Sequence, residues 1–392
     1  MTRPAPSLPL PDAAALEHSA RVVAALREEI ADGGGFITFA RYMEIVLYAP
    51  SLGYYVAGAR KFGAAGDFVT GPELTPLYGA ALAHQLHATL QATGTQRIVE
   101  LGAGSGALAA SILNALARCG GPSPSGSFVY SILEVSPDLR QRQGDTIVNL
   151  APGEAAAVEW LDRLPQEIEG AVVMNEVLDA VAPRVVARRG GAWYERGVAW
   201  KGEALVWDER PLADPRLLAL ARARFPAEGD YVSEINPAAE ALVATLARRL
   251  RSGAMMVVDY GFPRAEYYHP QRSEGTLIGH YRHHSHADPF LWPGLSDLTA
   301  HVDFTAVAEA AEGAGLRVAG FATQASFLLG CGILDLLAAT GAPESVAYLR
   351  ETAAVQKLIS PAEMGEMFKV LLLSRGDPAW RSLAVTDMTH RL

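Results

Sequence analysis

The feature that most constrains the fold is a short apolar run that ends in a glycine turn and leads into a helical pattern. The run begins at Arg97 and reads RIVELGAGSG, and ALAASILNALARCG follows it. Further apolar runs with strand character are FVYSILEV, AAVEWL, AVVMNEVLD, GAMMVVDYG, LRVAGFATQ and EMFKVLLLSRG. Apolar runs that alternate with helices indicate a mostly parallel sheet covered on both faces. The sequence therefore predicts an α/β fold with a doubly wound, seven-strand core.

Two segments interrupt this alternation. VVARRGGAWYERGVAWKGEALVWDERP alternates apolar and polar residues around glycine turns, which predicts an inserted β-meander. A helical insertion is expected from about Phe327 to Ile359, between the last two strands. Near the N-terminus the pattern predicts a helix over 13–31 and a second helix from Thr38, a plausible N-cap, to about Leu47. A long ordered loop rich in glycine, proline and tyrosine then leads into a helix expected over 74–91.

Composition and charge exclude several classes of protein. Half of the 392 residues are hydrophobic and 19% are charged, which provides a large core and excludes general disorder. No run of about 18 apolar residues occurs, so no membrane span is expected. The net charge of −10 makes nucleic acid a poor general partner. The chain has only two cysteines, which indicates a reducing compartment, and its N-terminal segment lacks the pattern of a secretory signal. We therefore expect a cytoplasmic protein.

The glycine turn predicts a nucleotide site at the start of a helix. Gly102, Gly104 and Ala107 fit the relaxed dinucleotide fingerprint, which leaves an NAD-linked oxidoreductase open. Gly106 and the preceding Glu100 instead complete a pattern typical of S-adenosylmethionine-dependent methyltransferases. Glu134 ends the second strand, where a carboxylate would accept the ribose hydroxyls of either ligand. The extra glycine and the expected strand count favour the methyltransferase.

Polar side chains follow the fourth strand, at Asn175, Glu176 and Asp179. Ligands of open α/β sheets lie outside the carboxyl ends of the strands, so we expect these residues in the pocket. If the methyl acceptor is a guanidinium, Glu176 is placed to hold and orient it by paired hydrogen bonds. Alternatively, Asp179 caps a following helix and Asn175 fixes a turn. Asp259, before a glycine at the end of the fifth strand, is as easily explained by a turn.

Four histidines are clustered in HYRHHSHADPF, after the fifth strand. Clustered histidines could bind zinc or nickel, but neither a nearby cysteine nor a helical H-E-x-x-H pattern supports a metal site. We therefore expect no metal and interpret this stretch as a polar loop over the active site.

Several motifs occur in order along the chain: ITFARYMEIVLYAPSLGYY, GDFVTGPELTPLYG, ELGAGSG, MNEVLDA, VDYG and LSDLTAHVDF. Together they resemble the family of the mitochondrial complex I assembly-factor protein arginine methyltransferase and its bacterial relatives. The resemblance extends from about Phe36 to Phe304. It implies a class I, Rossmann-like methyltransferase that uses S-adenosylmethionine, and the mitochondrial member makes symmetric dimethylarginine on a complex I subunit.

The resemblance also implies roles for individual residues. The cofactor would contact Glu100, Gly102, Gly104, Gly106 and Glu134, with Asp67, Thr70 and Glu73 closing the site from the N-terminal side. The catalytic residues would be Asn175, Glu176, Asp179 and His301, with Asp303 as a further contact near His301. The chain departs from the pattern in one respect, because Val185 stands where other arginine methyltransferases place a second acid.

These observations divide the chain into six segments. They are an N-terminal helical region with a cofactor-covering loop (1–96), the first half of the core (97–181), the inserted β-meander (182–236), the second half of the core with the histidine-rich loop (237–326), the helical insertion (327–360) and the last strand with its tail (361–392). We expect a protein-directed methyltransferase whose substrate is, for example, a respiratory complex subunit. The alternatives are a non-catalytic assembly or binding protein that keeps the fold, and an NAD-linked oxidoreductase.

Overall fold

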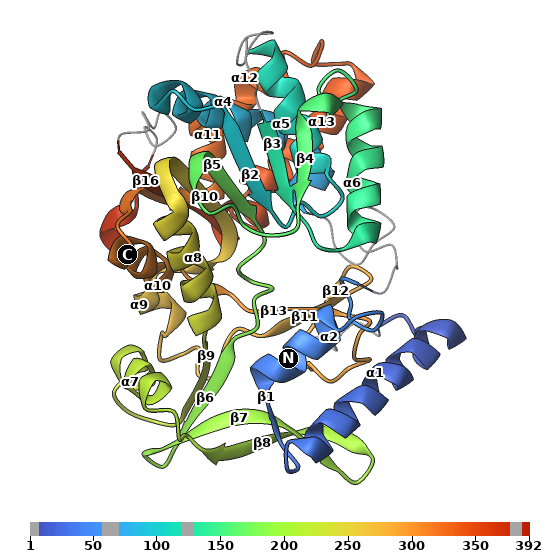
Figure 1. Cartoon of the computed structure of the whole chain (residues 1–392), viewed down its shortest axis with the longest axis vertical. Coiled ribbons are helices and arrows are strands. Elements are labelled where there is room, and N and C mark those ends of the chain that lie inside the picture. Colours follow the sequence, from blue (N-terminus) through green and yellow to red (C-terminus); the bar gives the residue numbers. More distant parts are fainter. Residues whose placement is uncertain (1–7, 57–69, 120–128, 377–385) are drawn as a thin grey trace. The chain divides into compact units, whose positions relative to one another are not determined.

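The computed structural model describes residues 8–56, 70–119, 129–376 and 386–392 (Figure 1). The chain forms two compact units. The larger unit takes its described residues from Thr70–Asp179, Ala239–Tyr267 and His301–Leu392. The smaller unit takes its described residues from Met1–Val69, Ala180–Ala238 and Tyr268–Ala300.

The larger unit contains a mostly parallel sheet with helices. Its strands are β2 (Arg97–Leu101), β3 (Val129–Leu133), β4 (Val158–Leu161), β5 (Ile168–Asn175), β10 (Leu250–Phe262), β14 (Val302–Asp303), β15 (Arg317–Thr323) and β16 (Phe368–Arg375). Its helices are α3 (Gly71–Leu74), α4 (Pro76–Thr93), α5 (Ala107–Arg118), α6 (Pro137–Leu150), α8 (Pro237–Arg249, which starts at the boundary between the units), α9 (Arg264–Tyr267), α10 (Phe304–Gly313), α11 (Gln324–Gly330), α12 (Ile333–Ala338), α13 (Val346–Ile359) and α14 (Met364–Met367), with 3-10 turns at Ala155–Ala157 and Thr389–Arg391.

The strand order is β15-β16-β10-β5-β2-β3-β4, and the short β14 pairs with β10. Figure 1 labels the strands from β16 to β4. The pairs from β10 to β4 are parallel, whereas β16 runs antiparallel to both of its neighbours. The chain proceeds outward from β2 through β3 to β4 and then returns to β5 on the other side of β2. This reversal creates a topological switch point between β2 and β5, where open α/β sheets bind ligands. The doubly wound, seven-strand prediction is confirmed.

Both faces of the sheet are buried. Val173, Met256 and Val370 belong to a hydrophobic cluster that also includes residues of α4 and α5. Their neighbours along the strands, such as Val172 and Met255, are buried as well. Successive side chains of a strand point to opposite faces, so apolar contacts cover the sheet on both sides. This explains why the strands are continuous apolar runs in the sequence rather than alternating ones.

The smaller unit contains two antiparallel sheets. Its strands are β1 (Ile37–Thr38), β6 (Arg184–Arg189), β7 (Ala192–Lys201), β8 (Ala204–Pro211), β9 (Tyr231–Ile235), β11 (Ile278–Tyr281), β12 (His284–His286) and β13 (Asp297–Thr299), and its helices are α1 (Ala13–Asp32), α2 (Phe39–Tyr48) and α7 (Pro215–Arg224). β6, β7 and β8 form the predicted meander, extended by β9 and β1. The two N-terminal helices form where the sequence predicts them, and Thr38 caps α2 through a hydrogen bond from the Arg41 amide (3.1 Å).

Three local predictions are corrected. The helix expected over 74–91 is divided at Thr75, whose hydroxyl accepts from the Leu77 amide (3.0 Å) and caps α4, with Pro76 as its first residue. The histidine-rich stretch forms the antiparallel hairpin β11–β12 rather than a loop. The helical insertion begins at Gln324, immediately after β15, because Thr323 provides the N-cap. The expected long loop has its central part, 57–69, outside the described residues. In the described part of the chain, none of the helices is long and apolar enough to cross a membrane.

Candidate active site

The glycine loop between β2 and α5 lies at the switch point of the sheet. Gly102, Gly104 and Gly106 have φ values of 69°, 52° and 87°, in the left-handed region that glycine adopts without strain. A Cβ on Gly102 would lie 2.7 Å from Cγ2 of Val177, in the turn after β5. A Cβ on Gly106 would lie 3.0 Å from Cα of Gln143. Close packing as well as backbone conformation therefore requires glycine at Gly102 and Gly106.

Glu100 lies beneath this loop, with 1% of its surface exposed. The Tyr130 hydroxyl on the neighbouring strand donates to Glu100 Oε2 at 2.8 Å. Burial raises the pKa of the Glu100 carboxyl to about 7, and the tyrosine hydrogen bond opposes the rise only in part. A cationic group brought near Glu100 would favour its ionised form. This is the property expected of a carboxylate that contacts an amino group.

Glu134 follows β3, and its half-buried carboxylate is held from two sides. Oε1 accepts from the Ser136 amide at 2.8 Å, and Oε2 accepts from Nε2 of Gln143 at 3.2 Å. A carboxylate has about four acceptor positions, so each oxygen retains capacity for another donor. The ribose hydroxyls of a nucleoside are donors of the required kind.

The segment before α4 contacts the glycine loop through one side chain. Glu73 of α3 accepts a hydrogen bond from the Ser105 hydroxyl. Thr70 occupies the N-cap position of α3 without a side-chain capping bond. Asp67, the third residue predicted for this part of the site, lies outside the described residues. The structure thus brings Glu73 to the glycine loop, and its contact with a cofactor stays a prediction.

Asn175 and Glu176 form the turn at the carboxyl end of β5. The Tyr78 hydroxyl donates to Oδ1 of Asn175 at 2.5 Å, and Nδ2 of Asn175 donates to Oε1 of Glu176 at 3.0 Å. Glu176 has a φ of 54°, which is uncommon for a residue other than glycine, and its amide donates to the Val258 carbonyl at 2.8 Å. Burial, together with the charges of Glu176 and Asp259, holds the pKa of Tyr78 well above its ordinary value, so the phenol remains a donor.

Asp259, at 0% exposure, organises the rest of this turn from β10. Its Oδ2 accepts from the amides of Leu178 (3.0 Å) and Asp179 (3.3 Å), and its Oδ1 accepts from the Tyr260 amide (3.0 Å). Burial and the charges of Asp179 and Glu176 hold the pKa of Asp259 well above its ordinary value, although the backbone donors oppose this. The alternative role of Asp179 as a helix cap is excluded, because the chain continues from this turn to β6 and not into a helix.

His301 precedes β14 and Asp303 ends it, and this short strand pairs with the end of β10. The His301 ring stacks on Phe262 at a centroid distance of 5.4 Å and meets the edge of Tyr260 at 5.5 Å. Asp303 caps α10, because its Oδ1 accepts from the Ala306 amide at 3.1 Å.

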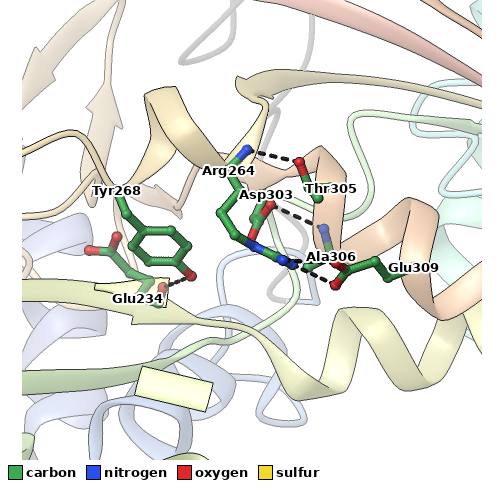
Figure 2. A network of polar contacts seen from close by, with 7 residues as sticks. All are labelled: Glu234, Arg264, Tyr268, Asp303, Thr305, Ala306 and Glu309. Carbon is green, nitrogen blue, oxygen red and sulfur yellow. Dashed lines mark hydrogen bonds and ion pairs between the residues drawn. The ribbon is translucent and has the colours of Figure 1, made fainter. Parts of the chain in front are cut away.

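Figure 2 shows the Asp303 carboxylate beside Arg264, whose Nε lies 3.6 Å from Oδ2 of Asp303. The same guanidinium contacts both carboxylate oxygens of Glu309, at 2.8 Å and 2.6 Å. Asp303 thus has a clear structural role, whereas His301 packs against the rings of Tyr260 and Phe262.

The residues present fit an S-adenosyl group. Gly106 precedes α5 without a side-chain capping bond of its own, and the Ala107 amide donates to the Ser105 hydroxyl at 3.3 Å. The glycine loop thus lies at the N-terminus of the helix, where backbone amides can bind polar groups of a ligand. Glu134 offers acceptors for a ribose, and Glu100 offers a buried carboxyl for an amino group. We call the ends of β2 and β3 with the glycine loop the nucleoside half of the site, and the ends of β5 and β10 the acceptor half.

Sequence patterns did not single out several residues that shape these two halves. Tyr78 and Tyr130 appear in the sequence as ordinary core aromatics, and Gln143 lies in a polar helical run. Asp259, by contrast, is visible in the sequence at the end of a strand, although a turn explains it at least as well. Tyr78 lies in α4 and Tyr130 near the start of β3, so neither follows the carboxyl end of a strand, and no sequence signal identifies them.

Comparison with known proteins agrees with this geometry. Residues 81–322 match the model of a family described as "Putative S-adenosyl-L-methionine-dependent methyltransferase". A mouse protein named protein arginine methyltransferase NDUFAF7, mitochondrial, is 30% identical over 86% of this chain and 81% of its own length. The zebrafish protein of the same name is 30% identical over 86% of the chain and 82% of its own length.

A solved structure is similar over nearly the whole chain. It is a crystal structure of a protein from Burkholderia thailandensis bound to S-adenosyl-homocysteine. That protein is 49% identical and superimposes with a TM-score of 0.94, over 98% of this chain and 100% of the other. The ligand is the demethylated product of S-adenosylmethionine. With the family match it favours the methyltransferase interpretation of the glycine loop over the NAD-linked one.

Proposed function

We propose, because the chain belongs to this family of S-adenosyl-L-methionine-dependent methyltransferases, that it transfers the methyl group to an arginine of a protein substrate. The bound donor supplies a methyl group on a positively charged sulfur. Transfer forms a bond between that carbon and a guanidinium nitrogen, the electron pair of the broken carbon–sulfur bond stays on sulfur, and the nitrogen loses one proton. The task of the chain is then to hold the guanidinium and to accept this proton.

The observation that carries the proposal is the concentration of carboxylates in the acceptor half. Glu176, Asp179 and Asp259 lie close enough that the charges of the first two raise the pKa of the third. The repulsion between like charges at a buried site is relieved by a bound cation, most effectively by one that also donates several hydrogen bonds. A guanidinium does both with its planar set of donors.

Within this group we assign Glu176 as the residue that contacts the guanidinium. Its carboxylate is half-buried, whereas Asp259 is fully buried and occupied by three backbone amides. Asn175 accepts a hydrogen bond from the Tyr78 hydroxyl and donates one to the Glu176 carboxylate, which orients that carboxylate. The names of the mouse and zebrafish relatives support arginine as the acceptor.

The experiment uses purified protein, S-adenosylmethionine with a labelled methyl group, and a protein extract from cells lacking this chain. Acid hydrolysis and amino-acid analysis identify the residue that carries the label. The proposal expects methylarginine, and expects Glu176→Gln to form it much more slowly. Glu169→Gln is the matched control, because Glu169 lies on the same strand and is exposed.

The possible outcomes separate the parts of the proposal. Label on a residue other than arginine would reject arginine and keep methyl transfer. Full activity of Glu176→Gln would reject the role of Glu176. A folded protein that binds the cofactor and labels no protein in the extract would favour the alternative of a non-catalytic assembly protein.

The substrate and the location are part of the same proposal. A subunit of a respiratory complex is the first candidate substrate, since the motif resemblance implies it. We propose the cytoplasm as the location, whereas the names of the curated relatives place those proteins in mitochondria. Cell fractionation followed by detection of the chain tests the location directly.

A further inference from the structure

One glutamine of the nucleoside half is buried in a helix whose sequence is strongly polar. α6 reads PDLRQRQGDTIVNL, and among its residues only Gln143 and Ile147 are buried. Gln143 has 0% of its surface exposed. A fully buried amide requires hydrogen-bond partners, and its partners here belong to the predicted cofactor site.

The side chain of Gln143 connects three parts of this half. Its Nε2 donates to the Gly104 carbonyl at 3.2 Å and to Oε2 of Glu134 at 3.2 Å. Its Oε1 accepts from the indole Nε1 of Trp160 on β4 at 2.9 Å. The glycine loop, the carboxylate after β3 and the edge strand are thus joined through one amide group.

The chemistry of the partners determines the orientation of this amide. An indole N–H can only donate, so the Gln143 oxygen must face Trp160. The Gly104 carbonyl and the ionised Glu134 carboxylate can only accept, so the NH₂ group must face them. A flipped amide would place two donors together on one side and three acceptors together on the other. The arrangement is therefore unique and holds Glu134 in one position relative to the glycine loop.

The backbone of α6 also supports this position. A Cβ on Gly106 would lie 3.0 Å from Cα and 3.2 Å from the carbonyl oxygen of Gln143. The glycine loop therefore packs directly against the helix backbone at this residue. Gln143 cannot move away from the loop without opening this contact.

We propose that Gln143 is a positioning residue that sets the preference of the site for a ribose with free hydroxyl groups. It acts through Glu134, and the inference rests on the proposed role of Glu134 as the acceptor of the ribose hydroxyls. With one acceptor position of Oε2 satisfied by Gln143 and one of Oε1 by Ser136, the remaining positions of the carboxylate point in fixed directions. Removing the amide frees the Glu134 carboxylate to rotate. The site should then bind a ribose with both hydroxyl groups with less preference over a deoxyribose.

The test measures binding by calorimetry and does not require turnover. The probes are S-adenosylhomocysteine and its 2′-deoxyribose analogue, and the measured ratio is the dissociation constant of the analogue divided by that of S-adenosylhomocysteine. Gln143→Met keeps the length of the side chain and removes its hydrogen-bonding groups. We expect this variant to bind S-adenosylhomocysteine about 10-fold more weakly and the analogue only about 2-fold more weakly, so that the ratio falls about 5-fold.

Matched variants show whether the effect is specific. Gln141→Met changes an exposed glutamine of the same helix, which donates to Asp145 at 2.9 Å, and should leave both constants unchanged. Trp160→Phe removes the donor that orients the Gln143 oxygen, together with part of the ring, and should lower the ratio by about 2-fold. It serves as the second measurement if Gln143→Met does not fold.

Each outcome decides one question. If Gln143→Met weakens both ligands equally, or changes neither, the inference is wrong and the amide is only structural. If Glu134→Ala leaves the ratio unchanged, the ribose role of Glu134 itself fails. If Glu134→Ala lowers the ratio and Gln143→Met has no further effect in the double variant, the two residues act together, as we infer.

Discussion

The two halves of the site hold their carboxylates in different ways. In the nucleoside half, Glu100 and Glu134 stand apart and are contacted by neutral donors from Tyr130, Ser136 and Gln143. In the acceptor half, Glu176, Asp179 and Asp259 are near one another, and their mutual charge disfavours ionisation of Asp259. The first half is suited to fix a ligand by directed hydrogen bonds. The second accumulates negative charge that a cationic acceptor would neutralise.

The largest effect should come from removing the charge of Glu176. Glu176→Gln keeps the shape of the side chain and the hydrogen bond from Asn175, but it removes the partner of the guanidinium. We expect kcat to fall by about 10²–10³-fold while the affinity for S-adenosylhomocysteine changes by less than about threefold. Initial rates and calorimetry on the same preparation measure the two quantities. Equal losses in both would mean that the halves are not separate in function.

Replacing Glu100 should have the second largest effect, on the stability of the folded protein rather than on turnover. Its pKa is raised from an ordinary value of 4.5 to about 7 in the folded protein. The folded chain therefore binds this proton more tightly than the unfolded chain does. The contribution of Glu100 to stability is complete below pH 4.5 and is lost as the pH rises through 7. Glu100→Gln lacks this loss, so between pH 4 and pH 8 its free energy of unfolding should gain roughly 3 kcal/mol relative to the wild type.

Denaturant unfolding at several pH values measures this difference, and a neighbouring residue provides a control of opposite sign. The pKa of Glu159 on β4 is lowered, first by the hydrogen bond from Ser131 and then by Arg97. Its contribution to stability is present above the ordinary pKa and is lost as the pH falls. Glu159→Gln should therefore lose stability relative to the wild type as the pH rises. The same trend in both variants would contradict the assigned environment of Glu100.

The glycine loop allows the two halves to be perturbed through one contact. Gly102→Ala places a methyl group 2.7 Å from Val177 and in a backbone conformation with a φ of 69°. We expect this variant to lose about 1–3 kcal/mol of stability and to bind S-adenosylhomocysteine about 10-fold more weakly. Adding Val177→Ala removes the collision but not the backbone strain. The double variant should therefore recover only part of the lost affinity, and full recovery would show that strain is unimportant here.

The nucleoside half could be predicted from the sequence better than the acceptor half. A strand, a glycine turn and a helix are contiguous, so Gly102, Gly104 and Gly106 can be placed from local pattern alone. The acceptor half depends on contacts between distant segments. Asp259 reaches amides about eighty residues earlier in the chain, at Leu178 and Asp179. Its Asp-Tyr-Gly context suggests a turn, yet β10 continues to Phe262.

Gln143 illustrates the same limit within the nucleoside half. Its neighbours in the sequence are arginine, glutamine, glycine and aspartate, so a helical pattern places it on a solvated face. It is buried because the glycine loop, 37 residues away at Gly106, packs on its backbone. Such a contact follows from the order of the strands and not from local propensity. Buried polar residues of this kind become visible only when the sheet is assembled.

The smallest effect should distinguish a structural carboxylate from the functional ones. Asp303 caps α10 and lies beside Arg264, which Glu309 also neutralises (Figure 2). Asp303→Asn keeps a capping oxygen and should be nearly neutral, whereas Asp303→Ala should cost about 1 kcal/mol in the free energy of unfolding. Neither should change kcat by more than about twofold, because the negative charge of the acceptor half comes from β5 and β10. A large loss of kcat in folded Asp303→Asn would extend the acceptor half to β14 and place His301 within it.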